Sequence, residues 1–291
     1  MAPTSPPASP ASPSSPSGPS SPYQSPPPQQ SALRPPPPQS LAHTLWNLYV
    51  PIFITHTSQP TAPFITSVPR FGYLALLLPR LEAYYGTPCS SFHHEQVQLR
   101  NLAVGLLVDL YQPTLPWHLV VSDGPEWDIA DTFMNSAKEA DFVRNGNAKQ
   151  IMSLSKDNTT ALWNAVQDND YAAFTKINNH LLNAPTALKN VPIRIYIPSS
   201  PAGSSNDDIA AAGSFKVMQT LIQPRLPNRS PQTLGNALKT ILPTLFPSSR
   251  DPVLANVVLH GAPVPFNAPL DELMRDAAYP DGWLCLVVVL L

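Results

Sequence analysis

The 291-residue chain is poor in charge and in cysteine, and each shortage excludes a class of protein. Charged residues make up 12% of the chain, against roughly 25% in average soluble proteins. The net charge is −2 and no Lys/Arg-rich run occurs, so the chain lacks the basic surface that binds nucleic acid. Its two cysteines, Cys89 and Cys285, are too few for a disulfide framework and too far apart for a Cys-x-x-Cys metal pair. We therefore expect free thiols in a reducing compartment.

The sequence also lacks segments that direct a chain to or across a membrane. Its N-terminus has no basic stretch followed by an apolar one, so a secretory signal is not expected. The longest apolar run, residues 283–291, is less than half of the about 20 residues that a spanning helix needs. These absences predict a soluble, cytoplasmic protein.

Motifs of the common enzyme classes are missing as well. The chain contains no Gly-x-Ser-x-Gly, no Gly-x-x-x-x-Gly-Lys-Ser/Thr and no Gly-x-Gly-x-x-Gly. Adjacent His93 and His94 would point in different directions, and no second cluster has ligand spacing. Ser153 and Lys156 match Ser-x-x-Lys, but the partner motifs of those acyl-transfer enzymes are absent. We predict no catalytic residue, no metal and no cofactor.

Proline, in contrast, is abundant, with 38 residues, of which 15 lie in residues 1–40. This segment has Arg34 as its only charge and almost no apolar side chains to offset ordering entropy. We expect a disordered tail with polyproline II character. Its Pro-x-x-Pro spacings and Ser-Pro pairs leave open a role in binding signalling domains, beside that of a passive extension.

Residues 41–122 are expected to form a short helix and a first β-containing unit. Ser40 is typical of a helix N-cap, and Leu41, Leu45 and Leu48 have the spacing of one helical face, which we expect to meet the core. Pro51 should end this helix. Four short apolar runs bounded by Pro or Gly then predict strands; they are 52–54, 73–78, 104–110 and 117–121. The part of the second run from Leu74 to Leu78 is ambiguous between strand and helix.

Residues 123–187 carry helical patterns and predict a three-helix region. The second and third helices are expected around residues 161–166 and 171–181, with a polar turn at 168–170 that makes them an αα-hairpin. The first is expected at residues 128–144, where five apolar residues share a stripe roughly 100° wide: Ile129, Ala130, Phe133, Ala137 and Ala140.

Lys138 of this first helix lies about 130° from the centre of the apolar stripe, so we expect its side chain to face solvent. Its neighbours one turn away are the apolar residues Met134 and Phe142. An ordinary surface lysine paired with Asp141 at i+3 is the simplest interpretation of Lys138 from the pattern alone.

Residues 188–291 predict a second sheet. Strands are expected at 191–197, 216–222, 257–259 and 283–291, with a helix at 233–242 between the second and third strands. The first strand alternates and should be half-buried, whereas the last is apolar on both faces and should be central and parallel to the first. Strand, strand, helix, strand, strand is the order of a ubiquitin-like β-grasp.

Several segments, in order from about Leu45 to the C-terminus, resemble the autophagy-related protein 5 family, and residues 1–40 do not take part. The resemblance implies an α+β protein of two ubiquitin-like β-grasp domains, at 41–122 and 188–291, flanking the helix-rich region. The segments are Gly-Leu-Leu-Val-Asp-Leu at 105–110, Leu-Pro-Trp at 115–117, Ala-Lys-Glu-Ala-Asp at 137–141, Pro-Ile-Arg-Ile-Tyr at 192–196, Gln-Thr-Leu-Gly at 232–235, His-Gly at 260–261 and Tyr-Pro-Asp-Gly-Trp-Leu at 279–284.

The resemblance also implies a function. Members of this family are joined through one lysine to the C-terminal glycine of the ubiquitin-like autophagy protein 12, by the E1-like autophagy protein 7 and the E2-like autophagy protein 10. The conjugate binds the coiled-coil autophagy protein 16 and acts in an E3-like way, promoting transfer of autophagy protein 8 from the E2-like autophagy protein 3 to phosphatidylethanolamine. The family's acceptor lysine lies in a Lys-Glu-Ala-Asp context, which here is that of Lys138.

On this interpretation the chain is a non-catalytic, cytoplasmic protein, peripheral on the preautophagosomal structure and the isolation membrane. We hypothesise that Met134 and Phe142 help to dock the attached modifier, and that Trp46 and Tyr49 contact the helix of autophagy protein 16. The chain is expected to receive a modifier and not to be one, because it ends in an apolar strand and not in a free glycine. A non-conjugated adaptor that binds signalling domains through the Pro-rich tail is the alternative.

Overall fold

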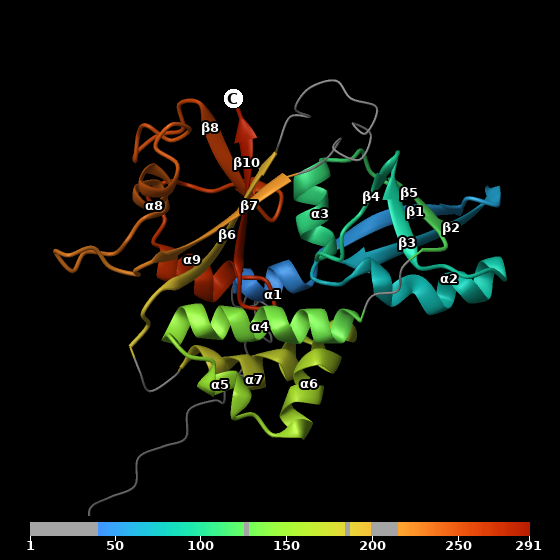
Figure 1. Ribbon diagram of the computed structural model, residues 1–291, viewed down its shortest axis with the longest axis horizontal. Coiled ribbons are helices and arrows are strands. Elements are labelled where there is room, and N and C mark those ends of the chain that lie inside the picture. The colour runs from blue at the N-terminus through green and yellow to red at the C-terminus, as the bar shows by residue number, and fades with distance from the viewer. Residues whose placement is uncertain (1–39, 125–127, 184–186, 199–214) are drawn as a thin grey trace, which may run out of the picture. The chain divides into compact units, whose positions relative to one another are not determined.

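The computed structural model describes residues 40–124, 128–183, 187–198 and 215–291, which contain two five-stranded sheets and a group of helices (Figure 1). Residues 1–39 of the Pro-rich tail, Trp127 and the 199–214 loop lie outside the described residues.

The first sheet has the strand order β2-β1-β5-β3-β4. β1 pairs parallel with β5, and all the other pairings of the sheet are antiparallel. Its strands and the helices around them are α1 (Leu41–Trp46), β1 (Tyr49–His56), β2 (Gln59–Pro69), η1 (Leu74–Leu77), α2 (Leu78–Tyr85), β3 (Ser91–His94), β4 (Val97–Gln98), α3 (Val104–Tyr111) and β5 (Trp117–Ser122).

Alternation along β1 and β5 builds the core of this first unit. Ile52 and Ile54 of β1 and Trp117 of β5 are fully buried, with exposed fractions of 0%. Helices cover this face, and α3 is one of them, so the predicted strand at 104–110 is wrong. Val104 to Leu107 and Asp109 of α3 are all buried, and a helix buried nearly all round has no polar stripe to distinguish it from a buried strand.

The second sheet repeats the same topology. Its order is β7-β6-β10-β8-β9, with β10 parallel to β6 and antiparallel to β8. This confirms the predicted β-grasp, in which the doubly apolar last strand is central and parallel to the first. The elements are β6 (Val191–Pro198), β7 (Phe215–Ile222), α8 (Leu234–Ile241), β8 (Ala255–Leu259), β9 (Ala262–Pro263), α9 (Leu270–Ala277) and β10 (Leu284–Leu290).

Two features of the second sheet differ from prediction. β6 is not half-buried, because α4 packs near one face while α9 covers the other. Tyr196, on the face expected to be wet, is only 2% exposed. Helix α9 was missed, although Leu270, Met274 and Ala277 form a buried stripe at i, i+4 and i+7.

The helical region contains four helices among the described residues instead of three: α4 (Ile129–Asn145), α5 (Lys149–Met152), α6 (Lys156–Gln167) and α7 (Tyr171–Leu182). The side chain of Asp128 accepts a hydrogen bond from the Asp131 N–H and caps α4, and Gly146 ends it in the left-handed conformation at φ 72°. The αα-hairpin of α6 and α7 is confirmed. In Figure 1, α4 runs between the second sheet and the other three helices.

The short first helix buries Leu45 as predicted, but not the other two residues of the expected face. Ser40 caps α1 as expected, accepting a hydrogen bond from the His43 N–H. However, Leu41 and Leu48 are 51% and 40% exposed, whereas Trp46 is buried. The helix ends after six residues, so Leu48 lies beyond it and does not continue the helical face.

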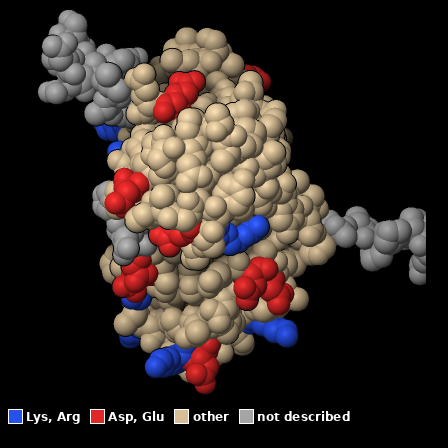
Figure 2. Space-filling view, turned by 90° about the vertical axis from the view of Figure 1, so that its right-hand side faces the viewer, with Lys and Arg blue, Asp and Glu red and all other residues tan. Residues whose placement is uncertain are grey.

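The fold is therefore α+β, with two ubiquitin-like sheets and a helix-rich region, as the sequence predicts. Charge remains sparse on its surface, and Figure 2 shows a wide area without charged side chains on the side where β2 and α2 lie. Exposed apolar side chains of these elements include Ile65 and Tyr84. Within the described residues, no helix is long and apolar enough to cross a membrane.

Candidate functional site

Lys138 lies in the middle of α4, and its amine is free of ion pairs with any described residue. Its Nζ donates a 3.3 Å hydrogen bond to Oδ1 of Asn135, on the same exposed side of the helix. The residue is half-buried overall, so its aliphatic stem is partly covered while its amine reaches solvent.

Glu139, the next residue, holds α4 to the second sheet. Its Oε2 accepts a 2.7 Å hydrogen bond from Nη2 of Arg194 on β6, and the two groups form an ion pair. The Arg194 side chain is 14% exposed and its Cζ lies 4.0 Å from the centre of the Trp283 ring. Arg194 is therefore bound on one side by a carboxylate and on the other by an aromatic face.

Ser136 makes the second attachment of the same helical turn. Its hydroxyl donates to Oδ2 of Asp281 at 2.7 Å and accepts from Nη1 of Arg194 at 2.9 Å. Its carbonyl oxygen accepts from Nε1 of Trp283 at 2.9 Å. Burial raises the pKa of Asp281, and the Arg194 charge opposes that rise. The turn of α4 that carries Lys138 is thus fixed to the β6 strand and to the loop before β10.

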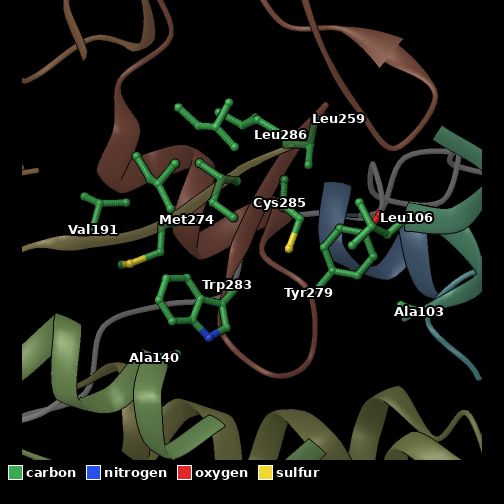
Figure 3. Close-up of a cluster of buried hydrophobic side chains, with 14 of the residues drawn as sticks. Ala103, Leu106, Ala140, Val191, Leu259, Met274, Tyr279, Trp283, Cys285 and Leu286 are labelled. Carbon is green, nitrogen blue, oxygen red and sulfur yellow. The ribbon is translucent and has the colours of Figure 1, made fainter. Parts of the chain in front are cut away.

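Ala140 provides close packing on the side of α4 that faces this loop. Gly282 has φ 87°, and a Cβ at that position would lie 3.2 Å from Cβ of Ala140 and 2.7 Å from Nη2 of Arg144. In Figure 3 the Trp283 side chain points toward α4, where Ala140 is labelled. Small residues are required at both positions for the loop to approach the helix.

Asp141 connects α4 to α5. It is 1% exposed, and its carboxylate accepts hydrogen bonds from Nδ2 of Asn145 at 2.7 Å and from the Ile151 N–H at 3.1 Å. Asp141 is therefore not paired with Lys138, and the expected i, i+3 pairing is wrong. Glu139, Ala140 and Asp141 of the Lys-Glu-Ala-Asp segment all contact other elements, although the Glu139 side chain is 60% exposed. Among the described residues, only the Lys138 side chain of this segment has no hydrogen-bond or packing partner assigned outside its own helix.

The two neighbours of Lys138 differ in exposure. Phe142 is 58% exposed, an unusual state for a phenylalanine. Met134 is half-buried and packs against buried hydrophobic side chains of the core. The apolar surface beside the lysine is therefore formed mainly by Phe142.

The predicted pair Trp46 and Tyr49 is divided between core and surface. Trp46 is 4% exposed and packs against Phe71 and Phe174, with ring centroids 5.5 Å and 4.8 Å away. Tyr49 is 54% exposed. Nδ2 of Asn169, in the turn between α6 and α7, donates to the Trp46 carbonyl at 3.1 Å and to the Tyr49 hydroxyl at 3.2 Å. Trp46 thus offers little surface to a partner in this conformation, whereas Tyr49 offers more.

A buried ion pair between Arg70 and Asp109 lies within the first unit, beside the turn after β8 of the second sheet, and was not expected from the sequence. Arg70 follows β2, Asp109 lies on α3, and a Cβ placed on Gly261, in the turn after β8, would lie 3.8 Å from both side chains. Burial raises the pKa of Asp109, while Arg70 opposes the rise. The only available signal was a charged residue within the apolar run 104–110, because a buried charge requires a partner.

His260 packs beside this ion pair. Its Nε2 bonds the Ala277 carbonyl at 2.8 Å, and its ring lies 5.3 Å from Phe71 and 4.7 Å from Tyr279. Burial lowers the pKa of His260 to about 4, so the imidazole is neutral at physiological pH. Figure 3 places Tyr279 beside Leu106 of α3, at the contact of the two sheets.

The remaining candidates have packing roles. Nδ1 of His94 lies 3.1 Å from Nε1 of Trp117, and no group of three metal-ligating side chains exists in the part of the chain that the structure describes. Cys89 and Cys285 are free and buried. Burial raises the pKa of Cys285 well above its ordinary value, so its thiol stays protonated and unreactive.

Two β-grasp sheets of the same strand order, together with a helical bundle, define a protein built from two ubiquitin-like domains. Residues 190–288 match the family model described as autophagy protein ATG5, UblB domain, and residues 126–184 match its alpha-helical bundle region. Autophagy protein 5 of Chaetomium globosum is 77% identical over 252 residues, 86% of this chain and 90% of that protein.

Further relatives agree. Autophagy-related protein 5 of Neurospora crassa is 74% identical over 262 residues, 87% of this chain and 72% of that protein. The crystal structure of Kluyveromyces marxianus Atg5 has a TM-score of 0.67 at 19% identity, over 86% of this chain and 99% of that one, and supports the fold alone. The chain belongs to the autophagy protein 5 family.

Proposed function

We propose that this chain is the acceptor of a ubiquitin-like modifier, autophagy protein 12, which is attached through Lys138. The observation that carries the proposal is the difference between the contacts of Lys138 and those of the next three residues. Glu139, Ala140 and Asp141 are occupied by Arg194, by the Gly282 loop and by α5, whereas the Lys138 amine has only a same-helix amide as partner among the described residues. A lysine that must attack a thioester held on another protein needs an amine without a competing partner. It also needs a rigid backbone that holds it in place.

The chemistry asked of Lys138 is an acyl transfer. Its neutral amine attacks the thioester carbonyl carbon at the modifier's C-terminal glycine, held on the cysteine of the E2-like autophagy protein 10. The C–N amide bond forms as the C–S bond breaks, the thiolate leaves with the E2, and the nitrogen loses a proton to water. Activation of the modifier by the E1-like autophagy protein 7 precedes this step. The chain itself supplies the nucleophile and no catalyst.

Phe142, with the partly covered Met134, is proposed to dock the attached modifier. An exposed phenylalanine one turn from the acceptor gives the covalent partner an apolar contact. The isopeptide bond holds the modifier at high local concentration, so even a weak contact would be occupied.

The exposed apolar side chains of Leu41, Leu48 and Tyr49 around α1 are proposed to contact the helix of autophagy protein 16. Trp46 would support this surface from beneath. In the resulting complex the conjugate would act in an E3-like way on autophagy protein 3, promoting transfer of autophagy protein 8 to phosphatidylethanolamine. This role places the protein in the cytoplasm and, as a peripheral protein, on the preautophagosomal structure and the isolation membrane.

Reconstitution tests the proposal directly. The chain is incubated with ATP, autophagy proteins 7 and 10 and the modifier, and the product is digested and analysed by mass spectrometry. A branched peptide linking the modifier's C-terminal glycine to Lys138 is expected. A branch on another lysine would overturn the site, and the absence of any product would overturn the function.

A further inference from the structure

A cavity of about 80 Å³ lies where α1, α4, α7 and α9 meet, away from Lys138. Its apolar lining includes Trp46, Phe174 and Met274, and its polar lining includes two arginines and two asparagines. One buried water needs roughly 10–15 Å³ on this scale, so the cavity has room for several waters or for one small polyatomic anion.

Arg144 of α4 is the buried charge in this cavity. It is 4% exposed and has no carboxylate ion-pair partner among the described residues. Its hydrogen bonding there is limited to a long 3.4 Å contact from Nη2 to the Gly282 carbonyl, and its buried Nε has no acceptor. A buried guanidinium without a partner is strongly destabilising, because its lost hydration is not replaced by an opposite charge. An anion at this position would therefore be strongly favoured.

The other charged groups at the cavity leave it net positive. Arg275, an exposed residue of α9, also lines it, and Asp276 beside it is the single carboxylate of the lining. Burial lowers the pKa of Arg144. The nearby charges of Asp141 and Asp281, which form no ion pair with Arg144, raise that pKa and so oppose the effect of burial. Arg144 remains protonated at physiological pH, as arginines in proteins do.

We propose that this cavity is a binding site for a small oxyanion of the phosphate class. Arg144 is its buried cationic contact, Arg275 its solvent-side contact, and the amides of Asn178 and Asn179 supply further donors. The planar fork of guanidinium N–H groups matches two oxygens of such an anion. The small volume between four helices fits a free anion and not a headgroup anchored in a bilayer. The site is independent of the function proposed for Lys138.

Titration of the full chain with inorganic phosphate, at ionic strength held constant with chloride, tests the site. Saturable binding is expected by calorimetry. Arg144→Met should weaken it about tenfold or more, and Arg275→Gln about threefold, because charge-assisted hydrogen bonds are lost. Arg225→Gln removes the same charge from an exposed turn, where Arg225 bonds only the Arg229 carbonyl among the described residues, and should bind like the wild type.

Thermal unfolding gives a second readout. Phosphate should raise the Tm of the wild type but not of Arg144→Met, and in phosphate-free buffer Arg144→Met should be at least as stable as the wild type, because an unpaired buried charge is replaced by an apolar chain. If Arg144→Met does not fold, the weakened binding of Arg275→Gln carries the test. Non-saturable binding by the wild type, wild-type affinity in both cavity variants, or binding only to phosphatidic acid vesicles would overturn the proposal.

Discussion

The indole Nε1 of Trp283 donates a 2.9 Å hydrogen bond to the carbonyl oxygen of Ser136, two residues before Lys138. The same indole ring supports the guanidinium of Arg194 from 4.0 Å. One buried side chain in the loop before β10 thus fixes both the backbone of α4 and the cation that binds Glu139, and the position of Lys138 depends on it.

Trp283→Phe is expected to lower the free energy of unfolding by about 2 kcal/mol, because it leaves the Ser136 carbonyl without its indole donor and weakens the cation–π contact. Chemical denaturation measures the change. Trp163→Phe is the matched control, since Trp163 is half-buried, and should cost clearly less. Equal losses in the two variants would contradict the role given to the Ser136 contact.

Gly282→Ala should cost about 3 kcal/mol, because it combines a left-handed backbone with a Cβ placed against Arg144 and Ala140. Gly86→Ala is the matched comparison. Gly86 has φ 67°, but a Cβ added there would meet no described atom within 4 Å, so only the backbone cost of about 1 kcal/mol applies. Chemical denaturation of both variants measures the two losses of stability. Their difference is the cost of the Cβ contact with α4, without the cost of the left-handed backbone. A Gly282→Ala loss no larger than that of Gly86→Ala would contradict the close approach.

Acid should destabilise the protein through His260. Because its pKa is lowered to about 4 in the folded state and is about 6.5 when unfolded, the unfolded state binds the extra proton between these values. Stability is full above pH 6.5 and falls by about 3 kcal/mol as the pH drops to 4. Asp109 and Asp281, whose pKa values are raised, act in the opposite direction.

The variant His260→Asn isolates this effect, since asparagine tolerates the φ of 52° found at this position. Subtracting its stability from that of the wild type at each pH removes the contributions of the two carboxyl groups. The wild-type free energy of unfolding minus that of His260→Asn should decrease as the pH is lowered below 6.5. A difference independent of pH would show that His260 does not titrate as described.

Phe142→Asp should slow formation of the conjugate about fivefold to tenfold, by replacing an apolar contact with a charge at the docking surface. Met152→Asp changes another exposed apolar residue, 66% exposed on α5, and should not alter the rate. The initial rate in the reconstituted reaction measures both. If the two variants react at the same rate, Phe142 does not dock the modifier.

Sequence patterns predicted the second sheet well, because β10 carries an apolar run too short for a membrane and too β-branched for a helix. They failed at α3, where Gly105 and a continuous apolar run concealed a helix buried on nearly all sides. They also failed at α1, whose six residues are too few for a periodic pattern to choose between Leu48 and Trp46 as the core residue.

Within the candidate site, the wheel position of Lys138 and the exposure of Phe142 followed from helical geometry alone. The partners of Glu139 and Asp141 did not, because Arg194 and Ile151 meet them only through tertiary packing. The Arg70–Asp109 pair was unpredictable for the same reason, since it joins the end of β2 to α3 at the contact with the second sheet.

The most direct test of the central claim is an immunoblot of cells that express the wild type, Lys138→Arg or Lys149→Arg. Arginine keeps the charge but is not a nucleophile at physiological pH, and Lys149 is an exposed lysine at the start of α5. A slower-migrating conjugate is predicted for the wild type and for Lys149→Arg, and none for Lys138→Arg. Persistence of that band in Lys138→Arg would contradict the assignment of Lys138 as the acceptor.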